Sequence, residues 1–246
     1  MIDLLRQTGG VAAEHYAPRA WETSFVGTSM PAGWSAFEGV IGSNADTYMR
    51  PQNVTLDGAQ ALLTCRAEPY GGKAHTGARL TTAGRRHMRY GRIDVSLRTL
   101  YGQGLACSIW LLPVSGAAWP AGGEIDIHEN PGPGASHSAR DTHVNLHWQV
   151  AGQHQQIATP RQYDTGHDLS ADFHTYSLVW TSQECTWLHD GVMLTTRAIS
   201  GYPFDVPYYL MIEVAVNGPN AWGGAPDSTT VLPATAAVDW VRYTPA

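Results

Sequence analysis

Three acidic residues fall within six positions of an otherwise apolar, β-branched run at residues 119–130, Trp-Pro-Ala-Gly-Gly-Glu-Ile-Asp-Ile-His-Glu-Asn. The interior of a strand is a poor place for carboxylates unless they face water, a metal ion or a substrate. Glu124 and Asp126 are two residues apart, so on a pleated strand both point to one face, while Ile125 and Ile127 point to the other. The run therefore predicts a strand with one face in the core and the other available for acid chemistry.

The third acid, Glu129, does not fit strict alternation, which would turn its side chain to the apolar face. A β-bulge at about Ile127-His128 would absorb one residue and return Glu129 to the acidic face. The Cα atoms of Glu124 and Glu129 would then lie four strand steps apart, roughly 13 Å. If both side chains lean inward, their carboxyl groups approach to roughly 5 to 6 Å, the spacing of a retaining glycosidase pair.

Such a pair would need one carboxylate charged, to attack an anomeric carbon, and one protonated, to give the leaving oxygen its proton. Like charges at short range raise one pKa, so neighbouring acids can divide these tasks. A solvated strand face with three acids is the plain structural alternative, but unpaired like charges there would destabilise a sheet.

A catalytic metal site is a second alternative, because the acids and nearby histidines supply enough ligand types for zinc. The candidate ligands would be Glu124, Asp126, His128, His143 and His147. The acidic strand contains no His-x-His and the chain no His-Glu-x-x-His. These absences disfavour a zinc site, and the resemblance of the whole chain to a known family implies catalysis without a metal cofactor.

The motif Glu-x-Asp-x-x-Glu at 124–129, preceded by Trp-Pro and Gly, resembles the signature of glycoside hydrolase family 16, in its laminarinase or endo-β-1,3-glucanase branch. The resemblance extends in the family's order over roughly residues 21 to 243. The segments that carry it are 90–98, 104–113, 142–148, 173–180, 186–194, 207–218 and 237–243.

The resemblance implies an endo-acting retaining hydrolase of a β-linked polysaccharide, either β-1,3-glucan (laminarin) or mixed β-1,3-1,4-glucan. It implies that Glu124 is the nucleophile, Glu129 the general acid/base, and Asp126 the residue that orients the nucleophile. A galactan of agar or carrageenan type as substrate, transglycosylation, and a β-glucan-binding module without catalysis remain as alternatives. Both Glu residues of the motif are present, which disfavours the module.

Sugar rings bind to flat apolar surfaces, and the chain has nine tryptophans. By position in the matching segments, Trp110 and Trp119 are candidates for the floor of the donor subsites. Trp222, in a Gly-rich loop, is a candidate for the rim. For each of them, a role in core or loop packing is the alternative.

Polar groups would then bind the sugar hydroxyls. His143, Asn145 and His147 alternate with apolar residues, and the resemblance places His147 in the cleft. Arg79 is either a hydroxyl donor or a member of a structural ion pair. Glu213 stands where relatives usually have Asn, which makes the substrate less predictable than the reaction.

From Asn53 onward, short alternating runs separated by turn residues recur to the C-terminus, and no long helical pattern competes with them. About a dozen such strands without an internal repeat predict an all-β sandwich of two stacked antiparallel sheets. The resemblance makes it a β-jelly roll of the concanavalin A type with a concave substrate cleft. We expect residues 1–20 to be an N-terminal extension and 21–246 a single domain. The predicted strands are 53–57, 61–67, 77–81, 88–98, 104–112, 122–129, 142–150, 173–181, 184–189, 192–197, 207–216 and 236–243.

The net charge of −6 argues against nucleic acid or an anionic membrane as a partner and suits a neutral polymer. No apolar run approaches the ~20 residues of a membrane span, and the first residues lack the pattern of a signal peptide. The substrate class nevertheless favours an extracellular enzyme, and we expect a monomer. The three cysteines are widely spaced, which predicts buried free thiols.

Many family members bind a structural calcium ion on the convex side. Gly58 and Asp239 match two of the contributions to that site. The acidic pair expected near Trp21 is missing, which reduces the oxygen ligands that calcium requires.

Overall fold

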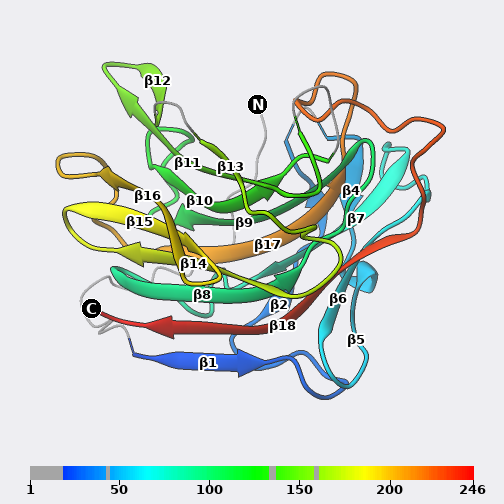
Figure 1. Cartoon of the computed structure of the whole chain (residues 1–246), viewed down its shortest axis with the longest axis horizontal. Helices are drawn as coiled ribbons and strands as arrows, with labels where there is room; N and C mark the ends of the chain where they lie inside the picture. Colours follow the sequence, from blue (N-terminus) through cyan, green and yellow to red (C-terminus); the bar gives the residue numbers. More distant parts are fainter. Residues whose placement is uncertain (1–18, 43–44, 133–136, 158–160) are drawn as a thin grey trace.

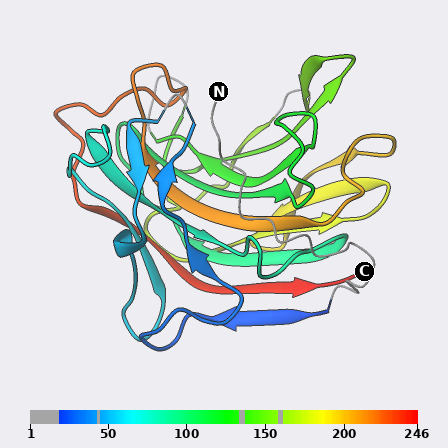
Figure 2. The same cartoon turned by 180° about the vertical axis from the view of Figure 1, so that it is seen from behind.

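The structure, a computed structural model, describes residues 19–42, 45–132, 137–157 and 161–246. Its strands form two stacked sheets (Figures 1 and 2). We name each sheet after a central strand. The β8 sheet has the order β16 (Val192–Ala198), β15 (Glu184–His189), β14 (His174–Trp180), β8 (Gly91–Arg98), β18 (Ala234–Thr244), β6 (Ala61–Cys65) and β5 (Val54–Leu56), with β1 (Trp21–Ser24) paired to β18.

The β10 sheet lies above it in Figure 1. Its order is β12 (Gln153–Gln156), β11 (Asp141–Val150), β10 (Glu124–Asn130), β9 (Leu105–Pro113), β17 (Tyr208–Val216), β7 (His75–Thr81), β4 (Thr47–Met49) and β3 (Gly39–Val40). Two further strands join at the side, β13 (Gln162–Asp164) on β11 and β2 (Ser35–Ala36) on β7. Within the described residues the paired strands run antiparallel, except β4 with β7, which are parallel.

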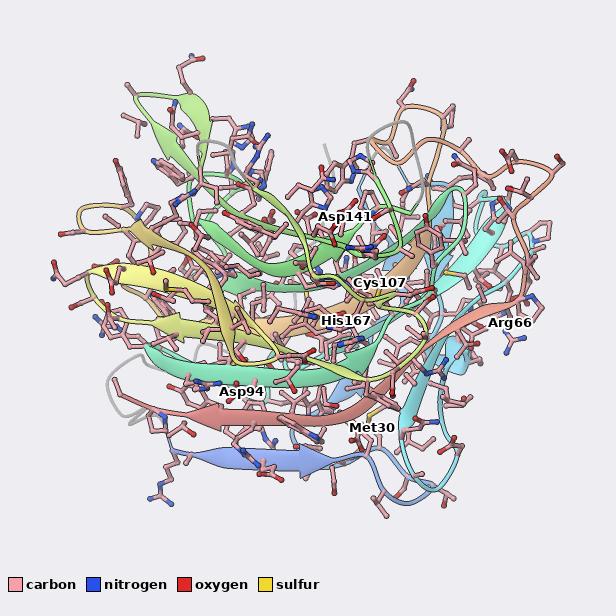
Figure 3. All side chains as sticks on the ribbon, in the orientation of Figure 1. Met30, Arg66, Asp94, Cys107, Asp141 and His167 are labelled. Atoms are coloured by element: carbon pink, nitrogen blue, oxygen red, sulfur yellow. The ribbon has the colours of Figure 1, made fainter. Side chains whose placement is uncertain are left out.

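The alternation read from the sequence builds the core between the sheets. In β9, Leu105, Cys107, Ile109 and Leu111 are buried, whereas the residues between them are half-buried on the opposite face. Cys107 lies in this interior (Figure 3). The three cysteines are buried and free, as predicted.

The all-β sandwich is confirmed, and each predicted strand from residue 53 onward coincides with an observed one. The sequence missed β1 to β4, β12 and β13, which are two to four residues long. A period of two residues is not detectable over such short segments. The predicted extension at 1–20 falls almost wholly outside the described residues, so the division at residue 21 stays a prediction.

Helical structure is minor in the described ranges, where the short 3₁₀ turn Pro51–Asn53 lies between β4 and β5. No helix in these ranges is long and apolar enough to cross a membrane.

The predicted β-bulge is present in β10. Asp126 is opposite Trp110 of β9, whereas His128 is opposite Ile109, so two steps on β10 match one step on β9. The buried indole of Trp187, on β15 of the opposite sheet, donates a hydrogen bond of 2.8 Å to the Asp126 carbonyl. The bulged backbone is therefore held from across the core.

We expect Trp187→Phe to lower the free energy of unfolding by about 1–3 kcal/mol, because the buried Asp126 carbonyl loses its donor while the aromatic ring is kept. Urea unfolding measures this loss. Trp180→Phe is the matched control, because its buried indole donates to the Phe204 carbonyl at 3.2 Å, away from the bulge. Amide hydrogen exchange at residues 126–129 should accelerate only in Trp187→Phe, and equal acceleration in both variants would contradict the assigned role.

Candidate active site

The acidic face of β10, which carries Glu124, Asp126 and Glu129, continues onto β11. In the antiparallel register Glu124 is opposite His147, and Asp126 is opposite Asn145. Beyond the bulge the register resumes with Glu129 opposite His143. Residues opposite each other on antiparallel strands share a face, so the bulge brings the third acid back beside polar partners.

The same face continues in the other direction over β9, β17 and β7. Ser108 of β9 is opposite Glu129, and Glu213 of β17 is opposite Ser108. Arg79 of β7 completes this row, because it is opposite Glu213. A continuous polar row therefore crosses five strands of the β10 sheet.

A cavity of about 510 Å³ opens on this face beside Glu129. We call it the cleft. Its lining consists of Glu129, His137, His143, Val144, Asn145, His147, Gln156, Arg161, Gln162 and Trp222. Glu124 and Asp126 do not line the cleft themselves, but both lie close to His147, which does.

His147 lies between the two acids of the unbulged part of β10. Its Nε2 atom is 3.3 Å from Asp126 Oδ2 and 3.7 Å from Glu124 Oε1. Its Nδ1 atom makes a 2.8 Å hydrogen bond with Nε2 of His154 on β12. The structure thus places His147 at the acids, as the resemblance implied. His154 at Nδ1 and the Asn145 amide, whose Nδ2 is 3.0 Å from Nε2, orient its ring.

Burial raises the pKa of all three acids, to about 9 for Glu124 and to about 8 for Asp126 and Glu129. The neighbouring Asp126 carboxylate raises the pKa of both Glu residues further. The side chains of Glu124 and Asp126 are only 14% and 4% exposed. At neutral pH the cluster therefore retains protons, and Glu129 has the protonated carboxyl group that a general acid needs.

A nucleophile must be ionised, and its raised pKa works against this for Glu124 in the ligand-free site. Two neighbours favour the charged form of this residue. His147 attracts the carboxylate, and the side chain of Trp119 donates a hydrogen bond to it. Of these two contacts, only the Trp119 hydrogen bond distinguishes Glu124 from Asp126, because His147 lies even closer to Asp126 Oδ2 than to Glu124 Oε1.

The three candidate tryptophans lie at different places along the acidic face. The Trp119 side chain is 56% exposed, with its ring centroid 5.8 Å from that of His147. Trp222 is 54% exposed and lines the cleft, with its ring centroid 4.7 Å from that of His143. Trp110, opposite Asp126, is half-buried between them.

Arg79 and Glu213 form an ion pair on the acidic face, with side chains that are 12% and 14% exposed. The Arg79 guanidinium carbon is also 5.1 Å from the ring centroid of Trp110. The ion pair that was one alternative for Arg79 is therefore present, and hydroxyl donation by Arg79 stays a prediction. Glu213 occupies a position where relatives usually have Asn, and in the structure its carboxylate pairs with Arg79.

Several cleft residues were not found from the sequence, because they come from loops and short strands. They are His137, Gln156, Arg161 and Gln162. His154, which bonds to His147 beside the cleft, was also missed. The polar segment Gln153-His154-Gln155-Gln156 was the available signal, but four polar residues in a row are also typical of a surface loop.

The residues proposed for calcium lie close to one segment of the chain. Gly27 donates its backbone N–H to the Gly58 carbonyl at 3.0 Å, and Phe25 donates to the Asp239 carbonyl at 3.1 Å. The nearest acid on β1, Glu22, is engaged in a 2.7 Å ion pair with Arg242. Calcium prefers six to eight oxygen ligands, and one carboxylate with carbonyls is a sparse set. This site stays a prediction, and nothing in the chemistry depends on it.

Comparison with known proteins agrees with this geometry. The family model "Glycosyl hydrolases family 16" matches residues 41–242. A "Beta-glucanase" of Rhodothermus marinus is 33% identical over 80% of this chain and 71% of its own length. The "Glucan endo-1,3-beta-glucosidase A1" of Niallia circulans is 26% identical over 90% of this chain, which spans 34% of that protein.

Solved structures show the same fold, and the matched region covers almost the whole length of both chains. The laminarinase catalytic domain from Thermotoga maritima superposes with a TM-score of 0.80 at 26% identity, covering 92% of this chain and 97% of that one. The laminarinase from Rhodothermus marinus gives a TM-score of 0.72 at 28% identity, with 92% and 98% covered. Because the family model covers most of the sequence and the acidic motif lies within it, the chain belongs to glycosyl hydrolase family 16 and is a glycoside hydrolase.

Proposed function

We propose that this protein, an endo-acting β-glucanase, cleaves β-1,3-glucan or mixed β-1,3-1,4-glucan by double displacement through a covalent glycosyl-enzyme. The observation that carries the proposal is the bulge in β10, which aligns Glu124, Asp126 and Glu129 on one face. The similar proteins of Rhodothermus marinus and Niallia circulans, a β-glucanase and a glucan endo-1,3-β-glucosidase, support β-glucan as the polymer.

In the first step the Glu124 carboxylate attacks the anomeric carbon while Glu129 donates its proton to the departing glycosidic oxygen. A glycosyl ester on Glu124 results, and Glu129 is left as a carboxylate. In the second step Glu129 removes a proton from water, the water oxygen attacks the anomeric carbon, and Glu124 leaves as a carboxylate. Asp126 lies between Glu124 and Glu129 on the strand and orients Glu124. His147 lies near both Glu124 and Asp126 and stabilises their negative charge.

The aromatic and ionic groups around the acids would hold the sugar rings. Trp119 and Trp110 lie on the Glu124 and Asp126 part of the face and fit the donor side, where the anomeric carbon is attacked. Trp222 lies at the Glu129 part, where the leaving sugar would be. The Arg79–Glu213 pair next to Trp110 offers both a donor and an acceptor to a hydroxyl group.

Substrate and catalysis are tested together by product analysis on laminarin, lichenan, agarose, κ-carrageenan and xyloglucan. We expect oligosaccharides from laminarin or lichenan. Glu124→Gln should lower kcat by at least about a thousandfold while oligosaccharide binding and folding are kept, because only the attacking carboxylate is lost. Near-normal turnover of Glu124→Gln would refute the nucleophile assignment, and products from agarose or κ-carrageenan alone would replace glucan by galactan.

The role of Glu129 is tested by chemical rescue. In Glu129→Ala, azide should restore part of the cleavage of an aryl β-glucoside with a good leaving group, because azide needs no general base to attack the glycosyl-enzyme. NMR spectroscopy of the product should show a β-glycosyl azide. An α-azide would mean inversion and would refute the pairing of roles.

The raised pKa values predict that the acidic cluster weakens the fold as pH rises. The folded protein keeps protons on Glu124 up to about pH 9, whereas the unfolded chain loses them near its ordinary value of about 4.3. Between these values the folded state binds more protons, so stability falls as pH increases. Glu124→Gln should therefore be more stable than the parent protein by at least about 1 kcal/mol at pH 8 and by almost nothing at pH 4.

Thermal unfolding from pH 4 to pH 9 measures this difference. Glu22→Gln is the control, because it removes an exposed carboxylate on β1. If the stability difference between Glu124→Gln and the parent protein stayed constant over this pH range, the Glu124 carboxylate would have the same pKa in the folded and unfolded states, which would contradict the prediction.

A further inference from the structure

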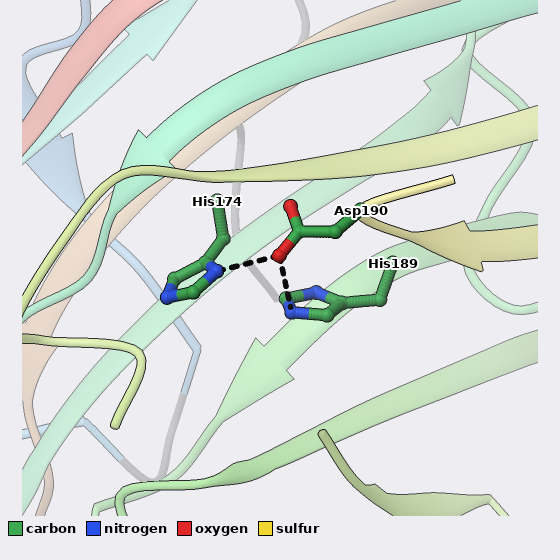
Figure 4. Close-up of side chains that lie close together, drawn as sticks. All are labelled: His174, His189 and Asp190. Carbon is green, nitrogen blue, oxygen red and sulfur yellow. Dashed lines mark hydrogen bonds and ion pairs between the residues drawn. The ribbon is translucent and has the colours of Figure 1, made fainter. Parts of the chain in front are cut away.

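Two histidines and an aspartate meet at one end of the β8 sheet, separate from the catalytic acids (Figure 4). His174 begins β14, His189 ends β15, and Asp190 follows in the turn to β16. His189 is opposite Tyr176 of β14, so its ring points into the space between the two sheets. None of these three residues lines the cleft.

The turn fixes the carboxylate. Asp190 and Gly191 have φ values of +48° and +78°, which is typical of a two-residue hairpin turn that reverses the chain sharply. The Asp190 N–H donates to the Thr175 carbonyl at 2.9 Å, and the Thr175 N–H donates to Asp190 Oδ1 at 2.7 Å. One carboxylate oxygen is therefore held by the backbone, and Oδ2 is left to face the two imidazoles.

The three ligand atoms have the spacing of a metal site. His174 Nδ1 is 2.7 Å and His189 Nε2 is 3.4 Å from Asp190 Oδ2, and all three lie within 4.8 Å of one another. Ligands at about 2.0–2.1 Å from a tetrahedral zinc ion are separated by about 3.3 Å. Small side-chain movements would bring the three atoms onto such a tetrahedron.

Unsatisfied polar atoms at this place point to a missing ligand. The His189 side chain is 5% exposed, yet neither ring nitrogen makes a hydrogen bond, and Asp190 Oδ2 approaches Nε2 only to 3.4 Å. Buried polar groups are rarely left without one, and a bound ion is among the few explanations. The Asp190 side chain is 40% exposed, so an ion could enter from solvent beside it.

We propose that His174 Nδ1, His189 Nε2 and Asp190 Oδ2 bind a zinc ion, with water in the fourth position. Imidazole and carboxylate ligands suit zinc better than calcium or magnesium, which prefer oxygen alone.

The site would tie the β15–β16 hairpin to β14 and reach the catalytic strand through packed rings. The ring centroid of Tyr176 is 5.1 Å from that of His189 and 4.2 Å from that of His128. His128 immediately precedes Glu129 on β10, and its ring is fully buried. Zinc would therefore stabilise the layer directly beneath the acid strand without contacting substrate.

Isothermal titration calorimetry of zinc chloride into the full chain, without an affinity tag and after removal of metals with EDTA, tests the proposal. We expect one equivalent bound per chain. Asp190→Asn, at a half-exposed position where folding should be kept, is expected to weaken binding at least about tenfold. His189→Ala should abolish it, with near-ultraviolet circular dichroism as the check on folding.

Two control variants separate this site from other zinc ligands. His75→Ala removes a simple pair, in which His75 Nδ1 is 3.4 Å from Asp46 Oδ2, and should bind zinc as the parent does. Glu124→Gln alters the second cluster with metal-ligand spacing, Glu124, Asp126 and His147, and should also keep one equivalent.

Cobalt(II) gives an independent readout, because a tetrahedral site produces intense visible absorption bands, which Asp190→Asn should remove. Absence of zinc binding to the parent protein would overturn the proposal. Equal binding by the parent and Asp190→Asn would also overturn it, and so would loss of binding in Glu124→Gln alone.

Discussion

The structure depends most on the burial of three carboxyl groups on a single strand. Moving acids out of water disfavours their charged forms, so β10 can hold them only as a cluster that shares protons and has polar neighbours. The bulge at Ile127 is what makes the cluster possible, because regular pleating would turn Glu129 into the apolar layer. The shape of one strand thus sets both the spacing of the acids and their protonation.

Most of the surroundings hold this strand in place. Apolar side chains of β9 and β10 fill the layer between the sheets, and Trp187 from the opposite sheet donates to the bulged backbone. The residues opposite the acids on β11 are polar and include His147, and Ser108 of β9 lies opposite Glu129. Dense packing on the core face of β10 therefore holds the acids in position on its opposite face.

The histidines serve two different environments. His147 and His154 lie on the open side of the β10 sheet, where they form a hydrogen-bonded pair beside the acids. His174 and His189 lie at the end of the β8 sheet, on the core side of their strands. His167, labelled in Figure 3, lies in the loop between β13 and β14, and its ring stacks on that of His174. Their environments differ because the first pair lies beside the acids of β10, whereas the second faces a carboxylate that the hairpin turn holds in place.

The sequence by itself determined what is local. Alternation predicted the strands from residue 53 onward, the acid spacing predicted the bulge, and the motif with its flanking segments predicted the family. These features were readable because side-chain direction in a strand repeats every two residues. Very short strands such as β2 and β12 carry too few residues for that period and were not found.

Only the tertiary structure decided which distant residues meet. Arg79 and Glu213 are 134 positions apart, and their pairing follows from the adjacency of β7 and β17. The convergence of His174 with Asp190 depends on how a hairpin turn lies against β14. Strand order and turn geometry are fixed by packing over the whole molecule, so no local pattern could have revealed these contacts.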